Sequence, residues 1–437
     1  MKPFHFQSLT EINQAAGELG VSIPLSETVA QLGKSVELYG HRVENRLVIQ
    51  PMEGCDGTHD GAPDELTLRR YRRFASGGAG LIWAEACAVR PEARANPRQL
   101  MLTENNLGAY QAMVEEIREI SMRENGFSPV LVLQLTHSGR YSKPEGVPTP
   151  LIACHNAAIE AKAPVGDDRI LSDDDLKALE ENYAVSAALA EKAGFDGVDV
   201  KACHRYLISE LLSAYNRPGE YGGSFENRTR LYRNAIAAAK SALSGNCFVT
   251  TRLNLYDGVA YPDGFGTAPG EGVAPDLTEA IRLVKELRKL GVELVDATIG
   301  NPYFNPHVNR PFDQGPYESP ESPLVGVARM CGCIGTVKKA VPEMKIICSG
   351  VSYLRQFSGN LAAGMLEQGM ADLAGFGREA FAYPQFARDL LKKGGMDKNR
   401  CCIACGKCTE LMRAGSTAGC VVRDEVYLPI YKRDVVK

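Results

Sequence analysis

Short apolar strands alternate with amphipathic helices along most of this 437-residue chain, and this alternation constrains the fold more than any other feature. The predicted strands are uniformly apolar, as in parallel sheets that are buried on both faces. They lie within residues 44–54, 79–89, 128–141, 194–200, 246–254, 292–300, 344–350 and 371–378. Eight strand–helix units of this kind predict an α/β protein whose strands close into a (β/α)8 TIM barrel.

An open, doubly wound sheet is the alternative that the same alternation allows. That fold carries a glycine-rich dinucleotide-binding turn after its first strand. Here the first strand runs into Pro51, Met52 and Glu53, with no such turn. We therefore favour the closed barrel.

The barrel is expected to span residues 43–395, with a further segment at each end. Residues 1–42 are predicted to form an arm with two helical patterns, Leu9–Leu19 and Leu25–Gly33, which packs against the barrel or against a partner subunit of a homo-oligomer. Residues 396–437 form a C-terminal segment that is rich in cysteine.

The composition is that of a globular protein. Hydrophobic residues make up 44% and charged residues 23% of the chain, which is enough apolar surface for a full core. The formal net charge of -4 gives no indication of a polyanion-binding surface. No apolar run is long enough to cross a bilayer, and the N-terminus lacks the apolar core of a signal peptide. We expect a cytoplasmic protein that binds neither nucleic acid nor membranes.

Polar residues at the carboxyl ends of the predicted strands mark the functional end of such a barrel. Gln134 offers an amide that can hydrogen-bond a ring edge in both directions, and Arg252 can stabilise negative charge. Gly350, Gly377 and Arg378 follow the last two strands, the usual phosphate-binding corner, where glycines let backbone N–H groups approach a phosphate. Together these residues predict a flavin mononucleotide (FMN) across the barrel mouth.

The turn after the fourth strand gathers three titratable side chains, Lys201, His204 and Tyr206. A tyrosine taken alone is more often a packed core residue, and a lysine is more often solvated. Because all three lie in one short turn at a strand end, we interpret them as a catalytic group.

From about Val43 to Ala387 the chain resembles the Old Yellow Enzyme type of NADH:flavin oxidoreductase. The resemblance rests on the order and spacing of NRLVIQPM, GGAGLIWAE, LQLTHSGRY, AGFDGVDV followed by CHRYL, NRPGEYGGSFENR and FGREAFAYP. Within that family the chain is most similar to the iron–sulfur branch of 2,4-dienoyl-CoA reductase and trimethylamine dehydrogenase. We expect it to lack their C-terminal dinucleotide-binding half.

The resemblance implies roles at defined positions. Tyr206 matches the family's proton-donating tyrosine, and His204 matches one half of the pair that holds the substrate's carbonyl oxygen. Lys201 stands where many members carry the other half, usually a histidine. The implied FMN contacts are Pro51, Met52, Glu85, Gln134 and Arg252, with Gly350, Gly377 and Arg378 near the phosphate.

Two further positions depart from the family pattern. The dienoyl-CoA reductases use a histidine after the sixth strand, where this chain has Pro302, with Tyr303 or His307 as nearby substitutes. The thiol or histidine often found after the first strand is replaced by Glu53. These departures leave the substrate class open.

Five of the 13 cysteines crowd together near the end of the chain. In a reducing compartment such crowding argues for a metal or a cluster rather than for disulfides. Cys402, Cys405 and Cys408 follow a C-x2-C-x2-C pattern, with Cys420 further on, which suits a 4Fe-4S cluster; the iron–sulfur branch holds one at this place. Cys401 in place of Cys402, and a four-cysteine zinc site, are the alternatives.

The sequence therefore predicts an FMN-dependent ene-reductase that transfers hydride from reduced FMN to the activated C=C bond of an α,β-unsaturated carbonyl, carboxylate or thioester, with Tyr206 as proton donor. NADH or NADPH would reduce FMN directly, or an electron-transfer protein would exchange electrons through the cluster. The alternative is an oxidative amine demethylase that passes electrons from FMN through the cluster to a partner protein, although a chain with one Trp shows no evident aromatic cage for a methylated cation. A non-catalytic barrel subunit is the third interpretation.

Overall fold

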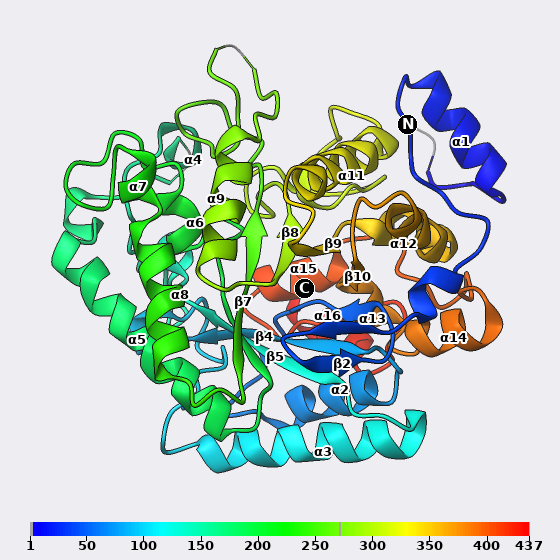
Figure 1. The fold of residues 1–437 in the computed structure, drawn as a ribbon, viewed down its shortest axis with the longest axis horizontal. Coiled ribbons are helices and arrows are strands. Elements are labelled where there is room, and N and C mark those ends of the chain that lie inside the picture. The colour runs from blue at the N-terminus through cyan, green and yellow to red at the C-terminus, as the bar shows by residue number, and fades with distance from the viewer. Residues whose placement is uncertain (1–2, 162, 271, 437) are drawn as a thin grey trace.

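A closed barrel of eight parallel strands forms the centre of the molecule, as the sequence predicts (Figure 1). The structure is a computed structural model that describes residues 3–161, 163–270 and 272–436. Neighbouring strands pair in chain order, and the last strand closes the circle by pairing with the first. The strands are β3 (Leu47–Ile49), β4 (Leu81–Ala88), β5 (Val130–Thr136), β6 (Gly197–Val200), β7 (Phe248–Asn254), β8 (Leu294–Thr298), β9 (Lys345–Cys348) and β10 (Leu373–Phe376).

A helix follows each barrel strand, which confirms the (β/α)8 fold (Figure 1). These helices are α2 (Glu65–Ala75), α3 (Leu107–Asn125), α5 (Asp173–Lys192), α8 (Arg230–Ala242), α9 (Thr278–Lys289), α11 (Pro323–Ala340), α12 (Ser358–Glu367) and α14 (Phe386–Lys393). Shorter helices in the loops are α4 (Ala157–Glu160), α6 (Leu207–Leu211), α7 (Phe225–Arg228), α10 (Pro306–Asn309) and α13 (Arg378–Ala382). None of the helices in the described ranges is long and apolar enough to span a membrane.

The start and the buried face of helix α5 both follow from residues within or next to the helix itself. Ser172 caps its N-terminus by accepting from the Asp175 N–H (3.1 Å), and the Asp175 carboxylate accepts in return from the Ser172 N–H (2.9 Å). Leu176, Leu179 and Tyr183 follow at helical spacing, and all three are buried, as their periodicity predicts.

A hairpin of β1 (Val36–Leu38) and β2 (His41–Val43) closes the amino-terminal end of the barrel, a feature that the sequence reasoning missed. Its inward-facing side chains join an apolar cluster with the first residues of several barrel strands. At its tip the Tyr39 ring stacks on Phe248 with ring centroids 4.2 Å apart. The expected boundary after residue 42 therefore falls inside an element that packs into the barrel.

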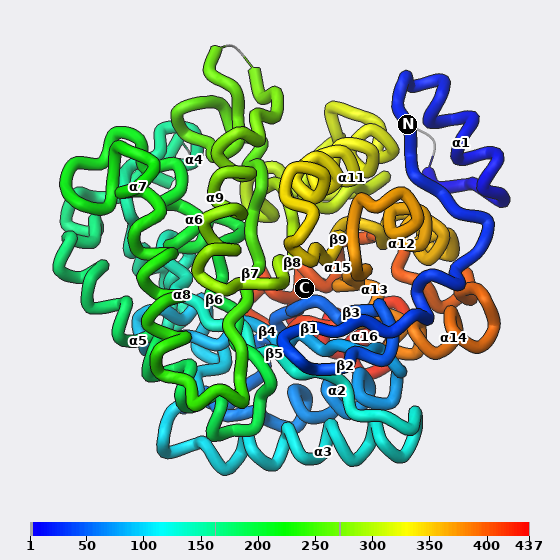
Figure 2. The backbone as a smooth tube through the Cα atoms, viewed as in Figure 1, coloured from blue at the N-terminus to red at the C-terminus, as the bar shows by residue number. Residues whose placement is uncertain are grey.

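The second helical pattern predicted in the arm is wrong. Helix α1 (Leu9–Glu18) forms, but within Leu25–Gly33 only a single 3-10 turn forms, at Ala30–Gly33. The backbone of Ser26 hydrogen-bonds Asn360 of α12 instead, with its N–H 3.0 Å from the Asn360 carbonyl oxygen. Tertiary contacts thus outcompete a weak helical propensity, and the arm passes α12 and α14 on its way to the hairpin (Figure 2).

The C-terminal segment folds back over the carboxyl-terminal end of the barrel and carries α15 (Lys407–Arg413) and α16 (Tyr427–Asp434). The Ala418 N–H donates to the carbonyl oxygen of Gly54 (2.6 Å), directly after the first barrel strand. Asp424 pairs with two arginines of α2. These contacts bring the cysteines to the end of the barrel where the functional residues are predicted.

Candidate active site

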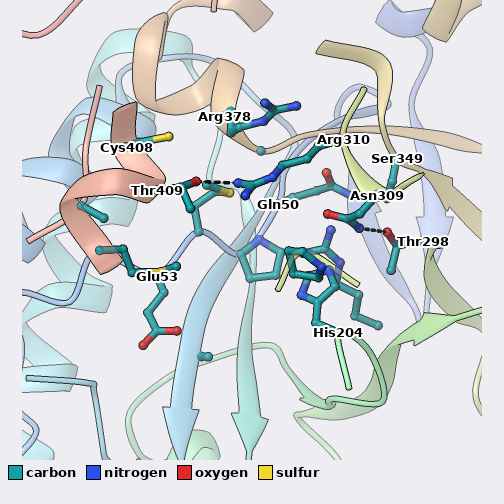
Figure 3. A pocket seen from close by; sticks show the side chains of 18 of the residues that line it. Gln50, Glu53, His204, Thr298, Asn309, Arg310, Ser349, Arg378, Cys408 and Thr409 are labelled. Atoms are coloured by element: carbon teal, nitrogen blue, oxygen red, sulfur yellow. Dashed lines mark hydrogen bonds between the residues drawn. The ribbon is translucent and has the colours of Figure 1, made fainter. Parts of the chain in front are cut away.

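A cavity opens at the carboxyl-terminal end of the barrel, between the strand ends and the C-terminal segment (Figure 3). It contains about 1100 Å³ of space, including open solvent. All three predicted catalytic residues line it, and so do seven of the eight predicted FMN contacts. They are Lys201, His204, Tyr206, Pro51, Met52, Gln134, Arg252, Gly350, Gly377 and Arg378. The structure therefore gathers in one place residues that the sequence predicted to act together.

Glu85 is the predicted contact that does not line the cavity. The pairing of β4 with β5 shifts between Ala84 and Ala86, so Glu85 is the extra residue of a β-bulge. Its carboxylate accepts from the Gly54 N–H (2.8 Å) and from Arg70 of α2, while Ala86 takes its place in the cavity wall. The prediction rested on the position of Glu85 near the end of its strand and on the family resemblance, and neither of these reveals a β-bulge.

Asp199 fixes Gln134 from inside the barrel. Its Oδ2 accepts from Gln134 Nε2 (2.6 Å) and from the indole N–H of Trp83 (2.9 Å), and its Oδ1 accepts from the Arg252 N–H (2.8 Å). Burial raises the pKa of Asp199 to about 7. The oxygen and one N–H of the Gln134 amide are left for a ligand, as recognition of a ring edge requires. No sequence pattern predicts the pairing of Gln134 with Asp199.

Asp296 holds the next part of the wall in the same way. Its Oδ1 accepts from Gln50 Nε2 (2.7 Å) and from the Ser349 hydroxyl (3.2 Å). Its Oδ2 lies 3.0 Å from Nε of Arg252 in a buried ion pair, although the two atoms are not aligned for a hydrogen bond. The carboxylate therefore places Arg252 without saturating its guanidinium, which keeps N–H groups free for an electron-rich ring.

Positive charge without a carboxylate partner gathers at the phosphate corner. Gly350 has φ of 79°, a backbone region that favours glycine, and Gly377 and Arg378 follow the next strand. Arg310, which the sequence reasoning missed, donates to Thr409 of α15 (2.5 Å, dashed in Figure 3). Burial and the neighbouring Arg378 lower the pKa of Arg310 to about 10. Neither arginine forms an ion pair within the described ranges, and two such guanidinium groups fit a phosphate.

The turn after β6 is strained and leaves a nitrogen without a partner. His204 and Arg205 adopt left-handed backbone conformations, with φ of 62° and 60°, and a buried ion pair between Arg205 and Asp257 (3.0 Å) anchors them. Nε2 of His204 is buried without a hydrogen-bond partner in the part of the chain that the structure describes. Burial and nearby Arg252 lower the pKa of the imidazole, so the ring is neutral at neutral pH. A bound polar group would satisfy this nitrogen.

Lys201 and Tyr206 contact each other directly. Nζ of Lys201 lies 3.6 Å from the centroid of the Tyr206 ring, a cation–π contact. Burial lowers the pKa of Lys201 and raises the pKa of Tyr206 well above its ordinary value. The Tyr206 hydroxyl lies 3.0 Å from that of Tyr303, on which the ring of Tyr141 stacks with centroids 4.0 Å apart. Tyr303 and His307 were the two residues considered as substitutes for the histidine that the dienoyl-CoA reductases use after the sixth strand. Tyr303 lines the cavity and His307 does not.

Glu53 stands at the end of the first strand, partly buried in the cavity wall. Its Oε1 accepts from the side-chain amide of Asn96 (2.7 Å). Burial raises the pKa of Glu53 to about 7, although Lys201 opposes the shift. The carboxyl can therefore exchange a proton near neutral pH.

A second, smaller cavity adjoins the phosphate corner and shares Arg378 with the first. Cys401 lies outside it, because its thiol donates to the carbonyl oxygen of Asp397 (3.3 Å). No group of three or more His, Cys, Asp or Glu side chains in the described ranges is arranged to hold a single metal ion. The four cysteines predicted as cluster ligands all line this cavity: Cys402, Cys405, Cys408 and Cys420.

Comparison with known proteins places the chain in a family. Residues 34–296 match the NADH:flavin oxidoreductase / NADH oxidase family. The chain belongs to this family. An NADPH dehydrogenase from Bacillus subtilis (strain 168) is 28% identical over 358 residues, which cover 80% of this chain and 91% of that protein. The resemblance found in the sequence is thus confirmed for the family, and the family is one of FMN-dependent oxidoreductases.

Solved structures share the fold. The chain of a 2-naphthoyl-CoA reductase complex with 2-naphthoyl-CoA superimposes with a TM-score of 0.73 at 19% identity, over 91% of this chain and 57% of that one. Histamine dehydrogenase from Rhizobium sp. 4-9 gives a TM-score of 0.68 at 21% identity, over 90% of this chain and 52% of that one. This chain therefore spans little more than half the length of either.

Proposed function

We propose that the protein is an ene-reductase that saturates the C=C bond of an α,β-unsaturated carbonyl, carboxylate or thioester. The observation that carries the proposal is the placement of Lys201, His204 and Tyr206 in one cavity with Gln134 and Arg252. Bound FMN would supply the hydride to the β-carbon, with NADH or NADPH as the source of electrons.

For FMN itself, the cavity offers separate partners for the ring and for the phosphate. The free amide groups of Gln134 and the unsaturated guanidinium of Arg252 suit the ring. The phosphate corner offers two unpaired arginines beside a left-handed glycine. The proposed contacts are Pro51, Met52, Gln134, Arg252, Gly350, Gly377 and Arg378, with Arg310 added and the side chain of Glu85 left out.

On the protein side, the substrate's carbonyl oxygen would be held by His204 and Lys201. In the tautomer with its proton on Nε2, His204 donates to that oxygen as it gains negative charge. Tyr206, whose raised pKa keeps it protonated at neutral pH, donates its proton to the α-carbon. The ammonium of Lys201 over the ring then stabilises the phenolate, and a proton from solvent, relayed by the hydroxyl of Tyr303, can restore Tyr206.

The amine demethylase has one observation in its favour and one against it. The rings of Tyr141, Tyr206 and Tyr303 form an aromatic group that the sequence did not reveal. The face of Tyr206, however, is already taken by the Lys201 ammonium. A cationic amine would face a like charge there, so the ene-reductase fits the site better.

The four cysteines around the second cavity are proposed to hold a 4Fe-4S cluster, which would let an electron-transfer protein exchange electrons with FMN. Iron and acid-labile sulfide analysis tests this with a matched pair of variants. Cys402→Ser should lose iron and sulfide, whereas Cys401→Ser, whose thiol lies outside the cavity, should keep both. If the wild-type protein contains zinc and no acid-labile sulfide, the four cysteines form a zinc site and not a cluster.

The reaction is tested with two substrate panels under anaerobic conditions. We expect NADH- or NADPH-dependent formation of the saturated product from at least one enone, enoate or enoyl thioester, followed by mass spectrometry. N-methylated amines should leave the oxidised flavin unbleached. Bleaching by an amine, with every unsaturated carbonyl inert, would favour the demethylase instead.

A further inference from the structure

A third cavity adjoins the active site and opens to solvent beside the C-terminal segment. It contains about 1220 Å³ of space including open solvent, and it shares Glu53, Tyr303 and Met412 with the cavity that holds Tyr206. A substrate whose reacting carbons lie beside Tyr206 can therefore extend past Tyr303 into the third cavity.

Basic side chains dominate the charged groups of this wall. Two of them are neutralised within the protein. Arg98 pairs with Asp64 (3.0 Å), and Arg140 pairs with Glu160 (2.7 Å). Arginines held in this way are part of the scaffold and leave little charge for a ligand.

Lys143 and Arg413 are different, because neither side chain forms an ion pair or hydrogen bond within the described ranges. Lys143 follows β5 and is partly buried, whereas Arg413 lies exposed at the end of α15, so two distant parts of the chain bring their charges to one cavity. Glu53 is the only acidic side chain among the described residues that line it, and its raised pKa of about 7 makes it a weak counter-ion. The wall thus carries an uncompensated positive charge.

The phosphate of FMN does not account for this charge. The phosphate corner, with Gly350 and Arg378, lies in the first cavity, and neither Lys143 nor Arg413 lines that cavity. The two cations are therefore available to a second anion. The apolar side chains of Pro97 and Met412 suit the part of a ligand that would connect it to the reacting end.

We propose that the substrate carries an anionic group, a carboxylate or a phosphate, at the end remote from its double bond, and that Lys143 and Arg413 bind this group in the third cavity. The inference rests on the proposed ene-reductase function, since it extends the same substrate. Both cations would form charge-assisted contacts that hold the substrate without touching the reacting carbons.

Binding without turnover tests the proposal. The probes are saturated ketones that carry, at the end of an alkyl chain, a carboxylate, a phosphate monoester or a neutral methyl ester. They are titrated into the oxidised holoenzyme by calorimetry and by flavin absorbance. At low ionic strength we expect the better anion to bind at least about tenfold more tightly than the ester, and Lys143→Gln and Arg413→Gln each to remove roughly a factor of ten. The preferred probe identifies the anion.

Lys432→Gln is the matched control, because this lysine lies exposed on α16 of the same C-terminal segment and lines none of the three cavities. It should bind every probe as the wild type does. Equal affinity of the ester and both anions, or an equal loss in Lys432→Gln and Arg413→Gln, would overturn the proposal. With matching enones, the two cavity variants should raise KM for the anionic enone and leave kcat unchanged. If the anion binds but no enone is reduced, the ene-reductase function fails by itself.

Discussion

Residues on the barrel strands form one wall of the active-site cavity, and residues on the loops after the strands form another. The two walls differ in whether their polar side chains have partners within the protein. On the strands, Gln134 donates to buried Asp199, and Arg252 is paired within the barrel. On the loops, Nε2 of His204 has no hydrogen-bond partner, and Arg378 has no carboxylate partner, among the described residues. Groups that the protein already satisfies are fixed before a ligand arrives, whereas buried groups without a partner are completed by the ligand.

This difference separates two kinds of mutational effect. Changes on the strand wall break internal pairs and should lower stability. Changes on the loop wall that remove a single hydroxyl or charge break no buried ion pair, so they should affect binding and turnover while the protein stays folded.

Tyr206→Phe should give the largest effect, on the loop wall. Loss of a positioned proton donor lowers a rate by about 10² to 10⁴. We expect that loss in the reoxidation of reduced enzyme by an enone, measured by anaerobic stopped-flow absorbance, with flavin reduction by NADPH unchanged. Tyr303→Phe removes only the neighbouring hydroxyl, 3.0 Å away, and should slow reoxidation much less. Equal rates in both variants would contradict the assignment of the donor.

Asp296→Ala should give the largest effect on the strand wall. It leaves Arg252 buried without its counter-ion and removes one of the two acceptors of Gln50. Breaking a buried pair in this way costs about 3–5 kcal/mol in the free energy of unfolding, measured by urea denaturation. The control is Glu44→Ala, whose pair with Arg42 is exposed and should cost about 1 kcal/mol or less. A loss for Asp296→Ala no larger than the control would remove the distinction between the walls.

Arg378→Gln should weaken FMN binding with little effect on folding. A charge-assisted contact to phosphate contributes roughly 1.5–3 kcal/mol, so Kd for FMN should rise about 10- to 100-fold. Fluorescence titration of the deflavinated protein measures it. Riboflavin, which has no phosphate, is the matched control and should bind wild type and variant alike. A parallel loss for both flavins would move Arg378 away from the phosphate.

Glu53→Gln should produce the smallest effect, a change in pH dependence. Burial raises the pKa of Glu53 in the folded protein to about 7, above that of the unfolded chain, so folding favours the protonated form. Its contribution to stability is present below the unfolded pKa and is lost as the pH rises through about 7. The Tm of Glu53→Gln relative to wild type should therefore increase between about pH 5 and pH 8. A constant difference would mean that Glu53 does not titrate in this range.

The sequence predicted the barrel and most of the cavity because both depend on regular features. Each strand can be recognised by its apolar composition. In a barrel the carboxyl ends of all strands meet at one end, and this rule located Gln134, Arg252 and Arg378. Glu85 was placed wrongly because neither its position in the strand nor the family resemblance reveals a β-bulge. In the arm, the contacts of Ser26 with Asn360 replaced a helix, and no local pattern encodes a contact over such a separation.

Residues on irregular loops were the hardest to place. Arg310 lies in a long connection after β8, where neither period nor motif indicates which side chains turn inward. Asp199 was visible within its strand, but its pairing with Gln134 depends on the register of two neighbouring strands. The stacking of Tyr141 on Tyr303 joins loops from different parts of the chain. Such contacts follow from the closed barrel, so they become predictable only after the fold is known.

In the proposed reaction, bound FMN would supply a hydride to one carbon of a C=C bond, and Tyr206 would donate a proton to the neighbouring carbon. The most direct measurement is a single turnover in D2O: the holoenzyme is reduced anaerobically, mixed with one equivalent of an enone, and the product is analysed by NMR. We predict reoxidised flavin and a saturated ketone with deuterium at the α-carbon and, because the N5–H of reduced flavin exchanges with D2O, at the β-carbon as well, formed far more slowly by Tyr206→Phe. Flavin that stays reduced with every enone, enoate and enoyl thioester would rule out the ene-reductase reaction.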